Sequence, residues 1–171
     1  MNDWQVIVMG VSGCGKSTVG ALLAQKLGAE FIEGDSLHPP SNVAKMAAGT
    51  PLTDADRVGW LHTIAAQLGA AHAADRSLVA SCSALKRSYR DTLRASAPDV
   101  RFVYLQGDFD LLGARMAARS GHYMPASLLA SQFAALEPPA ADEHAITLDC
   151  RLEPEMLAAQ ALAALTTESP A

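Results

Sequence analysis

The chain has 171 residues, of which 50% are hydrophobic and 18% are charged, and this length predicts one compact domain rather than two. Its 13 Lys and Arg residues against 18 Asp and Glu residues give a formal net charge of −5, so the surface as a whole repels nucleic acid and acidic membranes. Neither kind of partner is expected, and an anionic ligand must be held by a local group of cations.

The N-terminal segment and the cysteines indicate a cytoplasmic protein. The first apolar run, Val6 to Met9, is far shorter than the about 20 residues that span a bilayer, and no cationic start of a signal peptide precedes it. The three cysteines are widely spaced, odd in number and without a Cys-x-x-Cys pair. We therefore expect reduced thiols rather than a zinc site or a redox pair.

Short apolar runs alternate with longer amphipathic stretches, which predicts an α/β fold with a mostly parallel sheet and helices on both faces. In chain order, the expected strands are 6–9, 30–32, 77–81, 101–105 and 145–148. The expected helices are about 16–27, 41–48, 54–74, 86–96, 109–119, 126–136 and 153–165. Gly28 is expected to end the first helix, Thr53 and Asp56 form a near capping box, and Asp108 is a further cap. One domain is expected to span residues 1–171.

A phosphate-binding loop follows the first strand. Residues 10–17 contain the full G-x-x-x-x-G-K-S pattern between a strand and a helix. The glycines allow successive backbone N–H groups to converge with the helix N-terminus on phosphate oxygens. Lys16 is expected to reach the β- and γ-phosphates of ATP, and Ser17 is expected to ligate Mg²⁺. The predicted nucleotide contacts in this segment are Gly10, Ser12, Gly13, Cys14, Gly15, Lys16, Ser17 and Thr18.

The rest of the chain favours a kinase over a motor or a GTPase. It has no Asn-Lys-x-Asp guanine signature and no obvious apolar strand that ends in Asp-Glu. Asp35 follows the second expected strand, at the edge of an α/β sheet where ligands bind. There it would orient and deprotonate an acceptor hydroxyl in line with the γ-phosphate. The alternative is that Asp35 only caps a turn or a helix.

Two groups of cations are candidates for holding anions. Arg115 and Arg119 lie four residues apart on one helical face, where a closing lid would bring them onto ATP and the transferring phosphoryl group. Arg57, Lys86 and Arg90 are candidates for gripping an anionic substrate. In both groups the alternative is a solvated surface face.

Separated blocks along the chain carry a family resemblance. Among them are Glu33-Gly34-Asp35-Ser36-Leu37-His38-Pro39, Gly49-Thr50-Pro51-Leu52-Thr53-Asp54, Cys82-Ser83-Ala84-Leu85-Lys86-Arg87 and Ser131-Gln132-Phe133. Together with the phosphate loop, these blocks resemble the thermoresistant-type gluconokinases from the loop to about Pro138. The departures are Cys14 in place of a small Ser or Ala, Gly59 in place of a proline, and Tyr123 in place of Phe.

The resemblance implies a P-loop kinase fold similar to nucleoside monophosphate and shikimate kinases. It implies five parallel strands, a substrate-binding region at about residues 35–60, a mobile lid at about residues 119–126, and a homodimer. The implied reaction is the ATP-dependent phosphorylation of D-gluconate at its 6-hydroxyl, which yields 6-phospho-D-gluconate and ADP. A kinase of another hydroxy acid or sugar acid, or a non-catalytic nucleotide-binding module, is the alternative.

The resemblance also assigns roles residue by residue. Lys16, Asp35 and Arg119 would be catalytic, with Arg115 beside the adenine and Arg119 beside the phosphates. The implied substrate contacts are Asp35, His38, Arg57, Lys86 and Arg90. Arg57 is the best-supported candidate for the carboxylate, because related kinases use an arginine at that place for an acid substrate.

Overall fold

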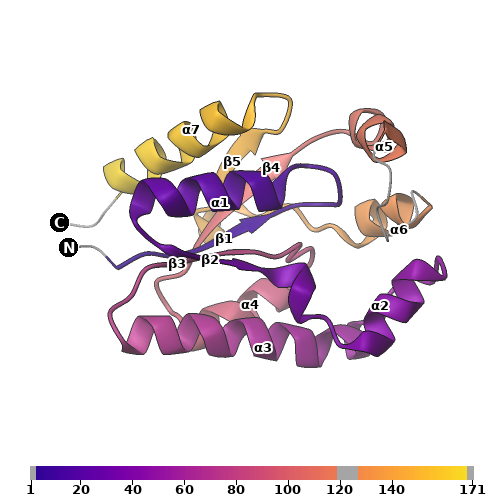
Figure 1. Ribbon diagram of the computed structural model, residues 1–171, viewed down its shortest axis with the longest axis horizontal. Coiled ribbons are helices and arrows are strands. Elements are labelled where there is room, and N and C mark those ends of the chain that lie inside the picture. Colours follow the sequence, from indigo (N-terminus) through magenta and orange to yellow (C-terminus); the bar gives the residue numbers. More distant parts are fainter. Residues whose placement is uncertain (1–2, 119–126, 169–171) are drawn as a thin grey trace.

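The computed structural model describes residues 3–118 and 127–168, which contain a single sheet of five parallel strands (Figure 1). The strands are ordered β2-β3-β1-β4-β5. Their bounds are β1 (Gln5–Met9), β2 (Glu30–Glu33), β3 (Leu78–Ser81), β4 (Arg101–Gln106) and β5 (Ile146–Asp149). The predicted five-stranded parallel sheet is confirmed.

The helices cover both faces of this sheet, as expected. Their bounds are α1 (Lys16–Leu27), α2 (Pro40–Ala47), α3 (Asp54–Ala73), α4 (Arg87–Ser96), α5 (Phe109–Ala118), α6 (Leu128–Ala135) and α7 (Pro154–Thr167). Two short 3₁₀ turns, η1 (Gly34–Leu37) and η2 (Ala141–Glu143), were not predicted. The expected helix ends at residues 119 and 126 lie outside the described residues.

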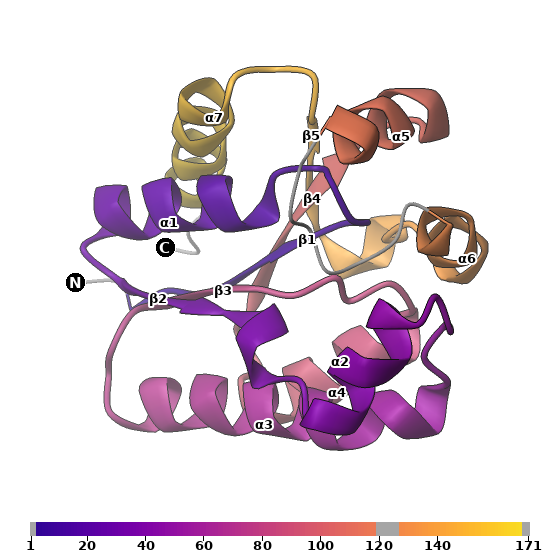
Figure 2. The same ribbon diagram turned by 45° about the vertical axis from the view of Figure 1, so that its right-hand side comes forward.

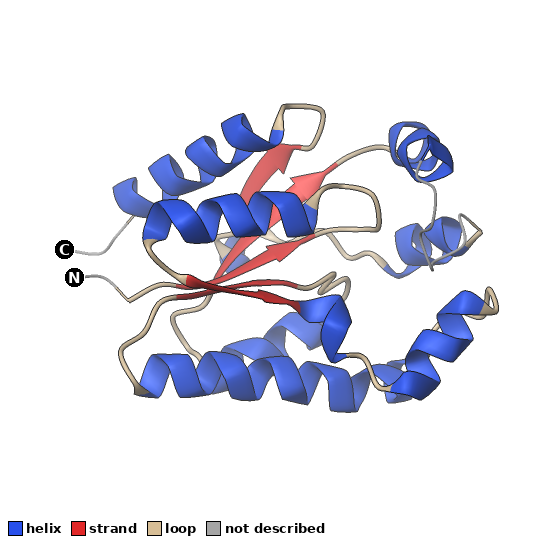
Figure 3. Ribbon diagram, in the orientation of Figure 1, coloured by secondary structure: helices blue, strands red, loops and turns tan. Residues whose placement is uncertain are grey.

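Helices α1 and α7 lie on one face of the sheet, and α3 and α4 lie on the other (Figures 1 and 3). At the carboxyl ends of the strands, α2 stands on one side and α5 and α6 on the other (Figure 2). The central strand β1 is buried along its whole length, because a parallel strand between two helical layers meets side chains on both faces. Among the described helices, none is both long and apolar enough to cross a membrane.

Local signals in the sequence place several helix ends correctly. The Thr53 hydroxyl accepts from the Asp56 N–H while the Asp56 carboxylate accepts from the Thr53 N–H, which is the predicted capping box. Asp108 accepts from the Leu111 N–H at the start of α5. Gly28 ends α1 in the left-handed conformation with φ of 64°, which glycine adopts without a Cβ penalty.

The junction between β2 and η1 brings two backbone segments very close together. A Cβ on Gly34 would lie 1.9 Å from the backbone oxygen of Ser81, so only glycine fits there. The Gly34 N–H donates to the Ser81 hydroxyl, and the Trp60 indole N–H donates to the Gly34 oxygen at 2.8 Å. The chain is thereby held against β3 one residue before Asp35.

Candidate active site

The loop between β1 and α1 has the geometry of a phosphate cradle. Gly10, Gly13 and Gly15 have φ values of 145°, 84° and 96°, which turn the backbone in a way that other residues rarely adopt. Helix α1 has no acidic residue in its first turn and, among the described residues, no side chain caps it. Its first N–H groups and the helix dipole are therefore suited to an anion such as a phosphate group.

Two further features complete the phosphate loop. The Lys16 ammonium donates to the Val11 oxygen at 3.1 Å, which holds the side chain along the loop. The Cys14 thiol is buried, and a Cβ on Gly10 would lie 2.7 Å from its sulfur. Cys14 therefore fills space inside the loop, as the small residue expected at that position would.

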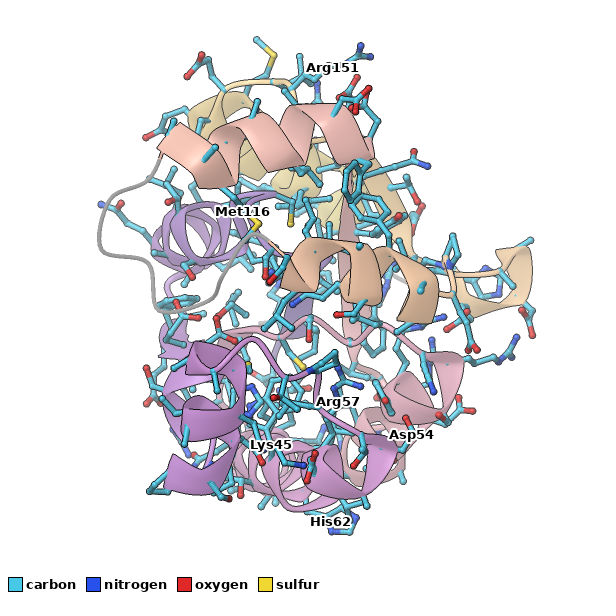
Figure 4. The ribbon with its side chains drawn as sticks, turned by 90° about the vertical axis from the view of Figure 1, so that its right-hand side faces the viewer. Lys45, Asp54, Arg57, His62, Met116 and Arg151 are labelled. Carbon is cyan, nitrogen blue, oxygen red and sulfur yellow. The ribbon has the colours of Figure 1, made fainter. Side chains whose placement is uncertain are left out.

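A pocket opens beside the phosphate loop at the carboxyl ends of the strands. It brings together five residues that the sequence singled out in three separate segments: Ser12, Lys16, Asp35, His38 and Arg57. Figure 4 looks onto this side of the molecule, with Arg57 between Lys45 and Asp54. The remaining wall is formed by Met46, Pro51, Leu52, Trp60, Ser83, Leu85, Leu128, Ser131 and Gln132.

His38 is held in the pocket wall as a neutral ring. It stacks on Trp60 with ring centroids 4.1 Å apart. The Asn42 amide nitrogen lies 3.3 Å from His38 Nδ1 and also donates to the backbone oxygen of Asp56. Because an amide nitrogen only donates, Nδ1 accepts and the ring proton sits on Nε2. Burial lowers the pKa of His38, with Asp35 raising it and Arg57 lowering it to smaller extents, so the ring offers an N–H donor suited to a hydroxyl.

The neutral state of His38 predicts a pH dependence of stability. The unfolded chain returns this imidazole to a pKa of 6.5, so below that pH the unfolded state takes up a proton that the folded state resists. The free energy of unfolding should fall as the pH drops from 6.5 to the lower pKa that His38 has in the folded protein. Above pH 6.5 the ring is neutral in both states, and the stability that goes with the neutral ring is fully present. Urea unfolding measured across that range in wild type and in His38→Asn, which keeps an acceptor for Asn42, should show a weaker pH slope in the variant. Identical slopes would contradict the neutral ring.

Arg57 reaches the pocket from the first turn of α3. It is half-buried, and its Nη1 donates to the Tyr89 hydroxyl at 2.9 Å. Its guanidinium carbon also lies 5.5 Å from the centre of the Tyr89 ring. Arg57 is thus a partly desolvated cation on the same pocket wall as Asp35 and His38.

The placement of Arg90 contradicts the expectation that it contacts substrate. Its side chain is completely buried, and its Nε and Nη2 donate to Glu143 at 2.7 and 3.0 Å. Its Nη1 donates to the Ala84 and Leu85 oxygens, and Ala84 has a left-handed φ of 45°. Arg90 therefore braces the segment after β3 from behind the pocket, and the Arg90 guanidinium holds the pKa of Glu143 at about 2.

Arg90→Met is expected to destabilise the fold, because it removes the two-pronged partner of the buried Glu143 carboxylate and leaves that carboxylate, among the described residues, only Arg94 and the Ala140 N–H. The free energy of unfolding should drop by about 3–5 kcal/mol, as for other broken buried pairs. Arg76→Met is the matched control, since Arg76 pairs with Glu30 on the surface and such pairs contribute at most about 1 kcal/mol. Equal losses in urea unfolding would contradict the bracing role.

Lys86 lies at the rim rather than in the pocket wall. Its ammonium donates to the Asp54 carboxylate at 2.9 Å, and it is absent from the residues that line the pocket. The hydrogen bond to Asp54 is the main cause of the raised pKa of Lys86. The structure thus pairs this cation with a protein carboxylate at the rim, and a contact between Lys86 and the substrate stays a prediction.

The remaining predicted residues lie near the ends of β4 and β5 or outside the described residues. Arg115 donates to the Cys150 oxygen at 2.9 Å, just after β5. A second hollow nearby is lined by Gln106, Gly107, Asp108, Leu111, Asp149 and Arg151. Arg119 and the predicted lid at residues 119–126 lie outside the described residues, so their roles stay predictions.

Gln132 is a site residue to which sequence reasoning assigned no role. Its side-chain oxygen accepts from the Ser12 N–H of the phosphate loop at 2.7 Å. The two residues are 120 positions apart, and the only sequence signal was the Ser131-Gln132-Phe133 block of the family resemblance. This hydrogen bond connects helix α6 directly to the phosphate loop.

The three cysteines are free and buried. Burial raises the pKa of the Cys82 thiol to about 12, and burial also raises the pKa of Cys150. A thiolate is the reactive form of cysteine, so the Cys82 and Cys150 thiols are suited to packing.

The sequence matches known proteins over most of its length. A family model described as an AAA domain matches residues 6–139. The gluconokinase of Gluconobacter oxydans (strain 621H) is 48% identical over 152 residues, which cover 89% of this chain and 85% of that protein. The thermosensitive gluconokinase of Escherichia coli (strain K12) is 47% identical over 140 residues, which cover 82% of this chain and 75% of that protein.

The fold matches solved structures over nearly the whole chain. The unliganded structure of a sugar kinase from Janibacter sp. HTCC2649 is 47% identical with a TM-score of 0.92, covering 97% of this chain and 96% of that one. A gluconokinase from Sinorhizobium meliloti 1021 is 46% identical with a TM-score of 0.88, covering 97% and 93%. Shikimate kinase from Aquifex aeolicus, at 14% identity and a TM-score of 0.66 over 95% and 96% of the two chains, shares the fold alone.

Proposed function

Because the chain belongs to the gluconokinase family of P-loop kinases, we propose that it transfers the γ-phosphoryl group of ATP to the 6-hydroxyl of D-gluconate. The observation that carries this proposal is the meeting of Lys16, Asp35 and Arg57 in one pocket. A phosphate-binding group, a carboxylate and a cation for an acid are the three requirements of such a transfer.

The phosphate loop positions the nucleotide. The N–H groups at the start of α1 and the Lys16 ammonium bind phosphate oxygens, and Lys16 exchanges its bond to the Val11 oxygen for one to the nucleotide. Mg²⁺ bound with ATP would supply neutralisation of the charge that develops on the phosphate oxygens. Ser17 in the first turn of α1 is the residue that would hold it.

Asp35 and Arg57 position the acceptor. The Asp35 carboxylate accepts the proton of the 6-hydroxyl as the hydroxyl oxygen bonds to the γ-phosphorus, and the bond to the β-phosphate oxygen breaks to release ADP. Arg57 binds the carboxylate of gluconate, and the Nε2–H of His38 donates to a hydroxyl. Holding both reactants in line is the larger part of catalysis in phosphoryl transfer.

The roles of two further residues follow from the family resemblance. Arg119 would stabilise the transferring phosphoryl group, and Arg115 would lie beside the adenine. The donation from Arg115 to the Cys150 oxygen keeps its guanidinium near the ends of β4 and β5, where ligands lie in α/β sheets.

A cytoplasmic homodimer is the form that we expect in the cell, and light scattering of the purified protein measures the oligomeric state.

Production of ADP by the purified protein tests this function. With Mg²⁺ and ATP, we expect turnover with D-gluconate and little with shikimate, AMP or no acceptor, and phosphorus NMR should show phosphate on the 6-hydroxyl. Lys16→Ala prepared in parallel controls for contaminating kinases. Equal slow hydrolysis under every condition would overturn the assignment to gluconate. Turnover with a different sugar acid would favour the alternative acceptor.

A further inference from the structure

A continuous chain of polar contacts leads from the pocket to the rim. Arg57 donates to the Tyr89 hydroxyl, the Tyr89 hydroxyl donates to Asp54, and Lys86 donates to the same carboxylate at 2.9 and 3.2 Å. Of these four residues only Arg57 lines the pocket. The other three continue from Arg57 toward the rim: Tyr89 lies on α4, Asp54 on α3 and Lys86 just before α4.

The hydroxyl of Tyr89 can take part in this chain in one way only. A guanidinium donates and never accepts, and an ionised carboxylate accepts and never donates. The single hydroxyl proton therefore points to Asp54, and an oxygen lone pair receives the Arg57 N–H. The Tyr89 side chain is 5% exposed, so its surroundings fix the position of the oxygen that holds Arg57.

Without this hydroxyl, Asp54 would compete for Arg57. The two residues stand three positions apart on the first turn of α3, a spacing at which opposite charges pair directly along a helix. Such a pair would draw the guanidinium toward the exposed Asp54 carboxylate and away from the pocket. Tyr89 and Lys86 occupy the Asp54 oxygens instead.

We propose that Tyr89 is a positioning residue that, with Asp54 and Lys86 behind it, keeps the Arg57 guanidinium turned toward the carboxylate of the acceptor. This inference rests on the proposed function, since it requires an acid as substrate. Tyr89 itself touches no reacting atom. Its effect appears in the recognition of the acid, because Arg57 has many rotamers of which only those facing the pocket are productive.

Tyr89→Phe tests this role with little change of shape. Removing a hydrogen bond to a charged group typically weakens binding by about 10-fold or more, so KM for gluconate should rise by about 10-fold. KM for ATP and the melting temperature should change little, because the ring still packs against Arg57 and Lys86. Tyr104→Phe is the matched control, as Tyr104 is a buried tyrosine on β4 that does not line the pocket.

A double-mutant cycle with Arg57→Gln separates positioning from a general structural role. If Tyr89 acts through Arg57, Tyr89→Phe should lower kcat/KM for gluconate in wild type but leave it nearly unchanged in the Arg57→Gln background. Equal effects in both backgrounds, or an unchanged KM in Tyr89→Phe, would overturn the inference while the proposed function stands. Absence of turnover by wild type with gluconate and with every other sugar acid would remove the proposed function, and the inference with it.

Discussion

Asp35→Asn is expected to lower kcat with gluconate by about 10²–10⁴-fold, the range typical for loss of a general base, while ATP affinity stays unchanged. The amide keeps the shape of the side chain but takes no proton from the acceptor hydroxyl. Asp35 lies in the pocket with Lys16 and Arg57, and Gly34 immediately before it is packed against Ser81. The backbone that carries the carboxylate is therefore held in place, so the variant should lose catalytic activity while it keeps its fold.

Two measurements check this expectation on Asp35. A coupled assay of ADP release gives kcat, and titration calorimetry gives the Kd for ATP. Asp142→Asn is the control, since Asp142 pairs with Arg87 on the surface away from the pocket and should retain the wild-type rate. A near-normal kcat in Asp35→Asn would remove Asp35 from the chemistry.

Lys16→Ala is expected to lose both tight ATP binding and turnover. The ammonium is the one cation of the phosphate loop, and its removal leaves the phosphate charge to the backbone N–H groups and the helix dipole. Loss of a single electrostatic stabiliser of a transition state commonly costs about 10²–10³-fold in kcat. The fold should remain, because among the described residues the Lys16 side chain donates only to the Val11 oxygen.

Thermal unfolding with and without ATP separates these effects for Lys16. A ligand that binds only the folded state raises the melting temperature, so the ATP-induced shift in wild type should vanish in Lys16→Ala while the melting temperature without ATP is kept. Lys26→Ala, at the other end of α1 where Lys26 pairs with Glu155, should keep the full shift. An undiminished shift in Lys16→Ala would contradict the phosphate role.

The sequence predicts most of this architecture because its signals are local. The phosphate loop, the capping box at Thr53 and the alternation of apolar and amphipathic runs each depend on residues within about 20 positions of one another. The segments were therefore placed correctly, and the rule that ligands bind at the carboxyl ends of parallel strands located Asp35 in the pocket. The 3₁₀ turn that carries Asp35 had no such local pattern and was missed.

The positions that Arg90 and Lys86 take in the structure depend on partners far along the chain. Arg90 has the sequence context of a cationic helix face, yet Glu143, 53 residues later, is buried against it. The rim position of Lys86 likewise follows from Asp54, 32 residues earlier. A single sequence carries no signal for such pairs, because the choice between a solvated cation and a paired one is made by packing.

The strand order has a consequence for dividing the chain. An exposed turn at Asp75 joins α3 to β3, and a cut there would leave β1 and β2 on one fragment and β3, β4 and β5 on the other. β3 separates β1 from β2, and β1 separates β3 from β4, so neither fragment can rebuild its part of the sheet alone. Lys16 and Asp35 would be on the first fragment and Gln132 on the second. Enzymatic turnover by a mixture of the two halves would therefore report their reassociation, which suits this chain to use as a split reporter.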